Sequence, residues 1–109
     1  MTIEPGQVYL IELGMAAKTR PMLVVSRRDD DAPRALCVCA PITTSTRNSA
    51  YEVSIGKPKF LHEPSYVNVQ GLQAIQHHEL KRMIGRLPDK ELQTVKIAIK
   101  WLFDIDATE

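Results

Sequence analysis

The spacing of the apolar residues changes at Pro88, and this change constrains the fold more than any other feature of the sequence. Before Pro88 the chain contains short apolar or alternating stretches between glycine, proline and polar clusters, a pattern typical of β-strands. After Pro88, apolar residues recur at helical spacing in one stripe: Leu92, Val95, Ile99 and Leu102. A small bent antiparallel sheet followed by one helix is an α+β architecture.

The first two thirds of the chain predict a sheet of short strands. We expect strands over residues 6–13, 20–28, 35–40, 51–55, 66–69 and 72–75. The third of these has almost no polar residue, which indicates burial on both faces, and Pro41 is expected to end it. Gly71, between the last two strands, predicts a bulge or a close approach of the backbone.

The C-terminal helix is expected to close the apolar core. Ala98 and Ile105 widen its apolar stripe. Three further apolar residues lie partly off the stripe: Ile97, Trp101 and Phe103. Such extra apolar surface indicates a partner or a second copy of the chain.

The composition is that of an ordinary globular protein. A chain of 109 residues forms one domain, here residues 1–109. With 44% hydrophobic residues, 25% charged residues and a net charge of +1, it carries no global signal for nucleic-acid binding, so any basic surface must be local. We expect no signal peptide, because residues 1–6 lack a basic stretch followed by an apolar run. No apolar stretch approaches the roughly 20 residues of a membrane helix. We therefore expect a cytoplasmic protein without membrane association.

The cysteines and histidines predict no metal site and no cofactor. Cys37 and Cys39 point to the same strand face, which makes a disulfide between them unfavourable, and two thiolates cannot complete a zinc site. We expect buried or half-buried thiols. His62 is isolated, and the adjacent His77 and His78 diverge, so all three are expected on the surface.

Local charge gathers in the first half of the chain. The basic residues there are Lys18, Arg20, Arg27, Arg28, Arg47, Lys57 and Lys59. If the loops at 14–19, 43–50 and 56–64 share one end of the sheet, they form a basic rim that can hold a phosphate backbone. On charge alone, a solvated surface is the better explanation of these residues.

Arg20 and the hydroxyl cluster at 43–46 are the remaining candidates for chemistry. An arginine at the mouth of one strand, opposite the Pro-x-Thr end of another, sets a fixed cation beside hydroxyl donors. This pair suits a phosphodiester, whose non-bridging oxygens gain charge in the transition state. Because arginine stays protonated, Arg20 fits charge stabilisation better than proton transfer.

Several short motifs follow one another along the chain. They are Gly6-Gln7-Val8-Tyr9, Arg20-Pro21-Met22-Leu23-Val24, Cys39-Ala40-Pro41-Ile42-Thr43-Thr44, Tyr66-Val67-Asn68-Val69 and Ile84-Gly85-Arg86-Leu87. Each motif alone is weak, but in this order the chain resembles the MazF/PemK/Kid family of type II toxin endoribonucleases over nearly its whole length.

The resemblance implies a small SH3-like antiparallel β-barrel with a C-terminal α-helix, assembled as a homodimer. It implies metal-independent, sequence-specific cleavage of single-stranded RNA, in which a 2′-hydroxyl attacks the adjacent phosphorus and leaves 2′,3′-cyclic phosphate and 5′-hydroxyl ends. It also implies a cognate antitoxin protein that blocks the site, and contact with operator DNA only through the antitoxin complex.

The resemblance assigns catalysis to Arg20 and Thr43. The residues that would bind flanking RNA are Lys18, Thr19, Thr44, Ser45, Thr46, Arg47, Asn48 and Gln70. Two features depart from the family: the 14–19 loop lacks a Gly-x-Glu segment, and Asn68 and Gln70 stand where the Kid-like branch has an arginine and an aspartate with acid–base roles. The general acid or base is therefore unassigned.

Two alternatives stay open. A relative of the same fold could bind RNA or an antitoxin without cleaving, which the missing acid–base residues would explain. A gyrase inhibitor of the CcdB type has a similar fold but acts through a Trp-Gly-Ile sequence, whereas here Trp101 is followed by Leu102 and Phe103.

Overall fold

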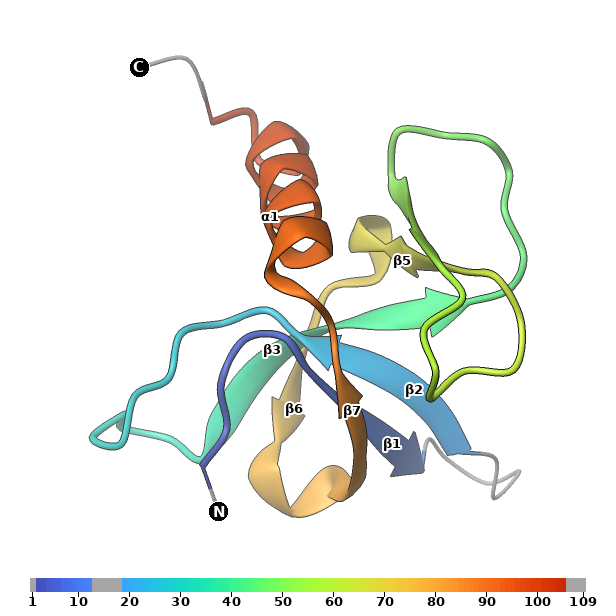
Figure 1. Cartoon of the computed structure of the whole chain (residues 1–109). Coiled ribbons are helices and arrows are strands. Elements are labelled where there is room, and N and C mark those ends of the chain that lie inside the picture. The colour runs from blue at the N-terminus through green and yellow to red at the C-terminus, as the bar shows by residue number, and fades with distance from the viewer. Residues whose placement is uncertain (1, 13–18, 106–109) are drawn as a thin grey trace.

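The computed structural model describes residues 2–12 and 19–105 (Figure 1). Its strands are β1 (Gln7–Glu12), β2 (Thr19–Val24), β3 (Leu36–Thr43), β4 (Glu52–Gly56), β5 (Ser65–Asn68), β6 (Gln73–Gln76) and β7 (Leu80–Arg86). The helices are two short 3-10 turns, η1 (Val69–Gly71) and η2 (His77–Glu79), and then α1 (Asp89–Leu102). The predicted order of a sheet followed by one helix is confirmed.

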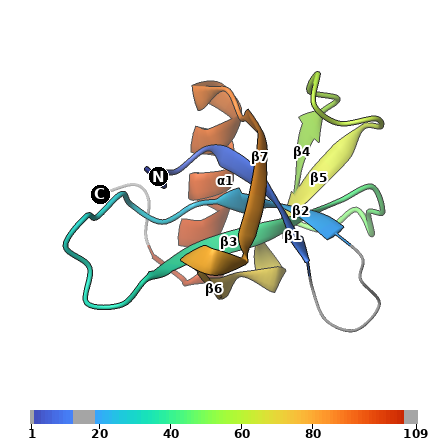
Figure 2. The same cartoon turned by 90° about the horizontal axis from the view of Figure 1, so that it is seen from below.

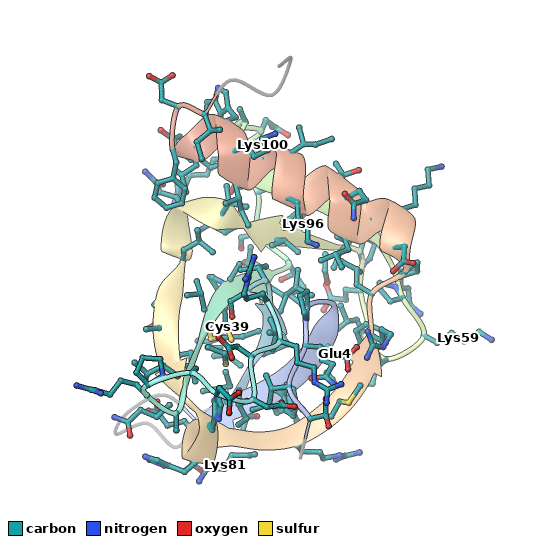
Figure 3. All side chains as sticks on the ribbon, turned by 90° about the vertical axis from the view of Figure 1, so that its left-hand side faces the viewer. Glu4, Cys39, Lys59, Lys81, Lys96 and Lys100 are labelled. Atoms are coloured by element: carbon teal, nitrogen blue, oxygen red, sulfur yellow. The ribbon has the colours of Figure 1, made fainter. Side chains whose placement is uncertain are left out.

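The strands form an antiparallel sheet in the order β4-β5-β3-β2-β1-β7, with β6 paired to β3. β2 lies along one edge of β3, while β6 and β5 share its other edge. The sheet therefore curls, as Figure 2 shows, and Figure 3 shows side chains within the curl. The predicted barrel-like sheet with a C-terminal helix is confirmed. The described strands do not close the barrel, because η2 joins β6 to β7 without pairing them.

Two apolar clusters pack on opposite faces of the central strands. The first lies between these strands and the layer of α1, β4 and β5, and it contains Val8, Leu23, Ala40, Ile42, Val53, Ile55, Val67, Val69, Leu87, Leu92 and Val95. The second fills the curled interior and contains Tyr9, Ile11, Met22, Val24, Cys37, Cys39, Ile75 and Leu80. Successive residues of β1, β2 and β3 alternate between the clusters. Burial on both faces explains why β1 and β2 show little polar alternation. In the first half of β3, Leu36 and Val38 are exposed while Cys37 and Cys39 are buried, so the prediction that residues 35–40 are buried on both faces is wrong for that part of the strand.

The two cysteines belong to the second cluster. Cys37 and Cys39 are both buried and free, and their sulfur atoms lie 3.7 Å apart on one face of β3. The hydrogen bond with Cys37 and the burial of the side chain raise the pKa of Cys39, which keeps this thiol protonated. The prediction of buried thiols is confirmed.

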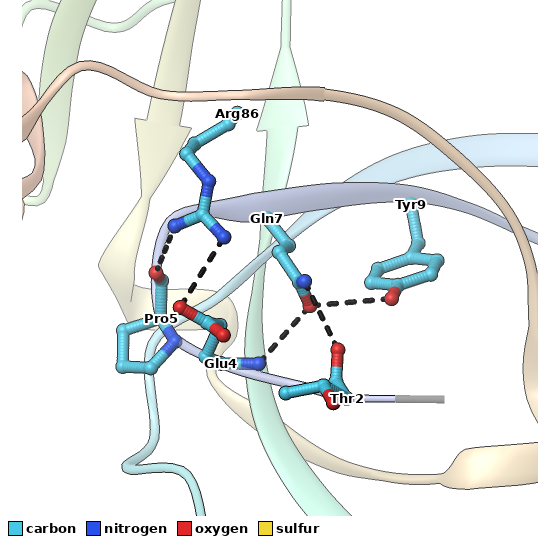
Figure 4. A network of polar contacts seen from close by, with 6 residues as sticks. All are labelled: Thr2, Glu4, Pro5, Gln7, Tyr9 and Arg86. Atoms are coloured by element: carbon cyan, nitrogen blue, oxygen red, sulfur yellow. Dashed lines mark hydrogen bonds and ion pairs between the residues drawn. The ribbon is translucent and has the colours of Figure 1, made fainter.

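A buried glutamine fastens the start of the chain to the sheet (Figure 4). Gln7 Oε1 accepts hydrogen bonds from the Glu4 backbone N–H at 3.0 Å and from the Tyr9 hydroxyl at 3.2 Å. Gln7 Nε2 donates to the Thr2 carbonyl at 3.0 Å. Burial raises the pKa of Tyr9, so its phenol remains a donor. Arg86 of β7 completes the network through an ion pair with Glu4 at 3.3 Å.

The predicted stripe of α1 faces the first cluster. Its buried or half-buried apolar residues are Leu92, Val95, Ala98, Ile99 and Leu102. The helix ends at Leu102, so the prediction that Ile105 extends the stripe is wrong, and Ile105 is exposed. Ile97, Trp101 and Phe103 are also exposed, as expected of residues off the stripe. Among the described residues, no helix is long and apolar enough to span a membrane.

β3 continues through Pro41 to Thr43, so the prediction that Pro41 ends this strand is wrong. The Val38 carbonyl accepts a hydrogen bond from the Val25 N–H at 2.9 Å, on the β2 side. Because successive residues of a strand point their N–H groups to opposite edges, the N–H that Pro41 lacks would lie on the other edge of β3, away from β2. η1 separates β6 from β5 there, so no ladder bond is lost. A Cβ on Gly71 would lie 2.7 Å from the Pro41 ring, which confirms the close approach predicted at this glycine.

β7 is a strand that the apolar pattern does not predict. It ends the strand order, and Lys81 and Arg82 are exposed on it. Charged side chains are common on such edge strands because they discourage pairing with other chains, but they weaken the apolar signal. β2 is shorter than predicted and ends at Val24. Val25 and Ser26 still hydrogen-bond to Val38 of β3. The chain then leaves the sheet, and Arg28 pairs with Asp30 at 3.1 Å.

Gly85 of β7 makes room for an aromatic ring from a distant loop. A Cβ at this position would overlap the Phe60 ring, with its Cγ only 2.5 Å away. Phe60 and Leu61 also pack against the first cluster. β7 therefore holds the loop between β4 and β5, residues 57–64, against the sheet.

Gly85→Ala is expected to lower the free energy of unfolding by about 1–3 kcal/mol, because the Phe60 ring must move to admit the methyl group. Urea denaturation measures this loss. The double variant Gly85→Ala, Phe60→Leu should be more stable than the sum of the two single losses implies, since leucine vacates the overlap. If the losses of free energy of unfolding add strictly in the double variant, or if Gly85→Ala is as stable as the wild type, the described packing of Phe60 on Gly85 is contradicted.

Candidate functional site

Arg20 and Thr43 meet at facing strand ends. Met22 of β2 lies opposite Pro41 of β3, and continuing this register by two residues sets Arg20 opposite Thr43. Opposite residues of an antiparallel pair share a face. Both line one cleft of about 630 Å³, named here the Arg20 cleft. Its lining residues are Thr19, Arg20, Pro21, Pro41, Ile42, Thr43, Thr44, Ser45, Leu61, His62, Glu63 and Ser65.

The Thr43 hydroxyl is oriented by the chain that follows it. Its Oγ1 accepts a hydrogen bond from the Ser45 backbone N–H at 3.1 Å. The hydroxyl proton therefore remains available to a ligand in the cleft. Arg20 is exposed at the same cleft and, as an arginine, is cationic at every physiological pH. One cation and one hydroxyl donor together suit an anion such as a phosphodiester.

One carboxylate shapes the loop between β3 and β4. Glu52 accepts hydrogen bonds from the Arg47 backbone N–H at 2.9 Å, and from the Ser49 N–H and hydroxyl at 3.1 and 3.0 Å. The Thr46 hydroxyl donates to the same carboxylate at 3.2 Å. The bonds from the Arg47 and Ser49 backbone hold the pKa of Glu52 below its ordinary value. Asn48 takes the left-handed φ of 56° that asparagine tolerates. The loop is exposed but has a defined shape.

A second cleft continues from the first. Named here the Arg47 cleft, it has a volume of about 450 Å³ and is lined by Pro41, Thr43, Ser45, Thr46, Arg47, Glu52 and Asn68. Pro41, Thr43 and Ser45 line both clefts, so the two meet at Thr43. The result is one continuous groove, with Arg20 lining one part, Arg47 lining the other and Thr43 lining both.

The structure brings most of the predicted site residues into this groove. Those that line it are Thr19, Arg20, Thr43, Thr44, Ser45, Thr46 and Arg47. The Thr46 hydroxyl is engaged within the loop, because it donates to Glu52 and accepts from the Asn48 N–H at 3.0 Å. Asn48 and Gln70 line neither cleft, and Gln70 is exposed in η1. Lys18 lies outside the described residues.

The predicted basic rim is narrower than the sequence pattern indicates. The loops at 43–50 and 56–64 do share one end of the sheet, and Arg20 and Arg47 face the groove between them. Lys57 and Lys59 line neither cleft, and Lys59 projects away from the fold in Figure 3. Arg28, paired with Asp30, belongs to the β2–β3 loop instead.

Two ionisable residues of the Arg20 cleft are absent from the predicted site. His62 and Glu63 come from the β4–β5 loop, and both are exposed. The sequence signal is an ionisable pair directly after the apolar Phe60 and Leu61, but only the fold shows that this pair lines the same cleft as Arg20. In the described part of the chain, no group of three or more His, Cys, Asp or Glu side chains could hold a metal ion.

Comparison with known proteins identifies relatives of the chain. The family model described as PemK-like, MazF-like toxin of type II toxin–antitoxin systems matches residues 4–103. The chain is 32% identical over 96 residues to endoribonuclease MazF3 of Mycobacterium tuberculosis, covering 88% of this chain and 93% of the relative.

Solved structures show the same fold. Mycobacterium tuberculosis toxin MazF-mt6 superposes with a TM-score of 0.79 at 31% identity, covering 92% of this chain and 98% of the toxin. A mycobacterial endoribonuclease in complex with its cognate antitoxin superposes with a TM-score of 0.83 at 24% identity, covering 95% and 97%. With the family model matching nearly the whole chain, the protein belongs to the PemK-like, MazF-like toxin family of type II toxin–antitoxin systems.

Proposed function

We propose that this MazF-type toxin endoribonuclease cleaves single-stranded RNA at short sequences without a metal ion. A 2′-hydroxyl attacks the adjacent phosphorus, so that the O2′–P bond forms while the P–O5′ bond breaks. The products carry a 2′,3′-cyclic phosphate and a 5′-hydroxyl. The observation that carries this proposal is the presence of Arg20 and Thr43 in one cleft, at facing strand ends.

Arg20 and Thr43 act on the charge that develops at phosphorus. The non-bridging oxygens become more negative as the 2′-oxygen attacks, and donors that are already in place stabilise this charge more than that of the ground state. The guanidinium supplies a cation with several N–H donors, and the Thr43 hydroxyl supplies one O–H donor. Thr43 needs no reorientation, since the Ser45 N–H already fixes its oxygen.

The groove on either side of Thr43 accommodates the flanking nucleotides. With the scissile phosphate at Thr43, one neighbour lies in the Arg20 cleft near Thr19 and Thr44, and the other lies in the Arg47 cleft near Ser45. In single-stranded RNA the bases are free to unstack, and hydrogen bonds to their exposed edges supply the sequence preference.

Partner proteins are proposed from the surface and from a relative. Ile97 and Trp101 in the C-terminal half of α1, and Phe103 directly after it, are exposed apolar residues, which suits contact with a second copy of the chain or with an antitoxin. The mycobacterial relative described above is an endoribonuclease in complex with its cognate antitoxin. We propose a homodimer whose antitoxin blocks the groove and supplies any contact with operator DNA.

A non-cleaving protein that binds RNA or an antitoxin is the second candidate. It is favoured by Asn68 and Gln70, which stand where the Kid-like branch carries its acid–base pair. The groove would then hold RNA without turnover, so cleavage itself separates the two functions.

Arg20→Ala is expected to reduce the cleavage rate of single-stranded RNA by about 10²–10³-fold, as loss of a transition-state donor does elsewhere. The assay uses purified protein with excess chelator and identifies the product ends by mass spectrometry. Arg20→Lys should recover little, because lysine lacks the forked donor geometry.

Arg27→Ala is the matched control, since Arg27 is exposed and lines neither cleft of the groove. It should cleave as the wild type does. Products with 3′-hydroxyl ends, or an Arg20→Ala variant of normal rate, would refute the proposed chemistry, and RNA binding without cleavage would favour the second candidate.

Glu52→Gln is expected to loosen the β3–β4 loop and to raise KM for RNA several-fold, with a smaller effect on kcat. The loop stays ordered while Glu52 is ionised. Because the pKa of Glu52 is lowered in the fold, this ordering is complete above its ordinary value of 4.5 and is lost as the pH falls through the lower folded value. Hydrogen exchange at the Arg47 and Ser49 amides, followed from neutral to acid pH, measures it.

Glu91→Gln, which removes a carboxylate from α1, serves as the control. It should alter neither KM for RNA nor hydrogen exchange at the Arg47 and Ser49 amides. Equal protection of the Arg47 and Ser49 amides in the wild type and Glu52→Gln would show that the carboxylate does not organise the loop.

A further inference from the structure

We propose that His62 accepts the proton of the attacking 2′-hydroxyl. This inference rests on the proposed RNA cleavage and supplies the base that the Arg20–Thr43 pair lacks. Arginine stays protonated and cannot act as a base, and the Thr43 oxygen already accepts the Ser45 N–H. Among the residues that the structure describes, the ionisable ones that line the Arg20 cleft are Arg20, His62 and Glu63.

The backbone on both sides of His62 is fixed, although its ring is exposed. Before it, the Phe60 ring packs over Gly85, and the Leu61 N–H donates to the Pro58 carbonyl at 3.0 Å. After it, the buried Ser65 donates its hydroxyl to the Glu63 carbonyl at 2.8 Å. The backbone of His62 is therefore held in place beside the Arg20 cleft, which His62 lines, by its neighbours on either side.

The imidazole is free to take a proton. Among the described residues, no hydrogen bond or ion pair occupies the His62 side chain. Histidine is the side chain that ordinarily changes charge between pH 5 and 8, so it can both accept and release a proton near neutral pH. A carboxylate is a weaker base toward a hydroxyl than a neutral imidazole is. These properties favour His62 over its neighbour Glu63.

The proton balance of the step is complete. The unprotonated ring nitrogen of His62 takes the 2′-hydroxyl proton as the O2′–P bond forms. The P–O5′ bond breaks, and the departing 5′-oxygen takes a proton from water. The imidazolium then returns its proton to solvent, which neutralises the hydroxide left behind. Nothing is oxidised or reduced, and no other reactant is required.

The test compares His62→Gln with His78→Gln in chelator. His78 is exposed and lines neither cleft, so its variant is the matched control. His62→Gln is expected to lose about 10²–10⁴-fold in kcat with KM little changed. The fall in wild-type kcat toward acid pH should be absent from this variant. Added imidazole should partly restore His62→Ala, which a purely structural role would not allow.

A substrate with a 5′-bridging sulfur separates base from acid, because a thiolate leaves without taking a proton. A His62→Gln defect that persists on this substrate supports the base, whereas a defect that vanishes overturns that assignment. Glu63→Gln is expected to retain the acid limb of the wild-type pH profile. Loss of activity in Glu63→Gln, with normal His62→Gln, would move proton transfer to the carboxylate and overturn the proposal.

The failures of the two proposals are distinguishable. If Arg20→Ala loses cleavage while His62→Gln keeps the wild-type rate and pH profile, the inference about His62 fails and the proposed function stands. If the wild-type chain cleaves no RNA, both fail together.

Discussion

The pairing of β2 with β3 is the constraint on which the rest of the structure depends. Met22 opposite Pro41 carries Arg20 to a position opposite Thr43, and this places cation and hydroxyl at one cleft. The strands are buried on both faces, with Leu23 in the first cluster and Met22 in the second. A slip of one residue would exchange the two faces and turn Arg20 away from the groove. The register that buries the core therefore also builds the site.

The loops that complete the groove are ordered by local bonds and packing. The Glu52 carboxylate accepts hydrogen bonds from several donors of the β3–β4 loop, and the packing of the Phe60 ring against Gly85 holds the β4–β5 loop on the sheet. Such preorganisation matters because catalytic groups that are already in place need no reorganisation during the reaction. The same bonds divide the polar residues into two kinds. The Thr46 hydroxyl is used to shape the loop, whereas the Thr43 hydroxyl proton remains available to the substrate.

Much of the fold could be predicted from local patterns, because periodicity reports which face of an element is buried. The alternation of Val53 and Ile55 with polar neighbours predicts β4, and the spacing of Leu92 and Val95 predicts α1. β7 could not be predicted, because its exposed charges hide the apolar signal of an edge strand.

The site was predictable only where residues lie at the ends of recognisable strands. Arg20 and Thr43 lie at such strand ends. His62 lines the same cleft because the packing of Phe60 on Gly85 holds its loop there. That contact joins the β4–β5 loop to β7, and no local pattern encodes it. The prediction that Pro41 ends β3 is wrong for a related reason. A proline interrupts a strand only where the neighbouring strand would accept a hydrogen bond from the N–H that proline lacks.

The most direct measurement is the structure of the chain bound to a short single-stranded RNA whose scissile nucleotide is 2′-deoxy, which binds but cannot react. We expect the scissile phosphate within hydrogen-bond distance of the Arg20 guanidinium and the Thr43 hydroxyl. The flanking nucleotides should occupy the Arg20 and Arg47 clefts. RNA bound on another face, with Arg20 and Thr43 free of phosphate, would contradict the central claim.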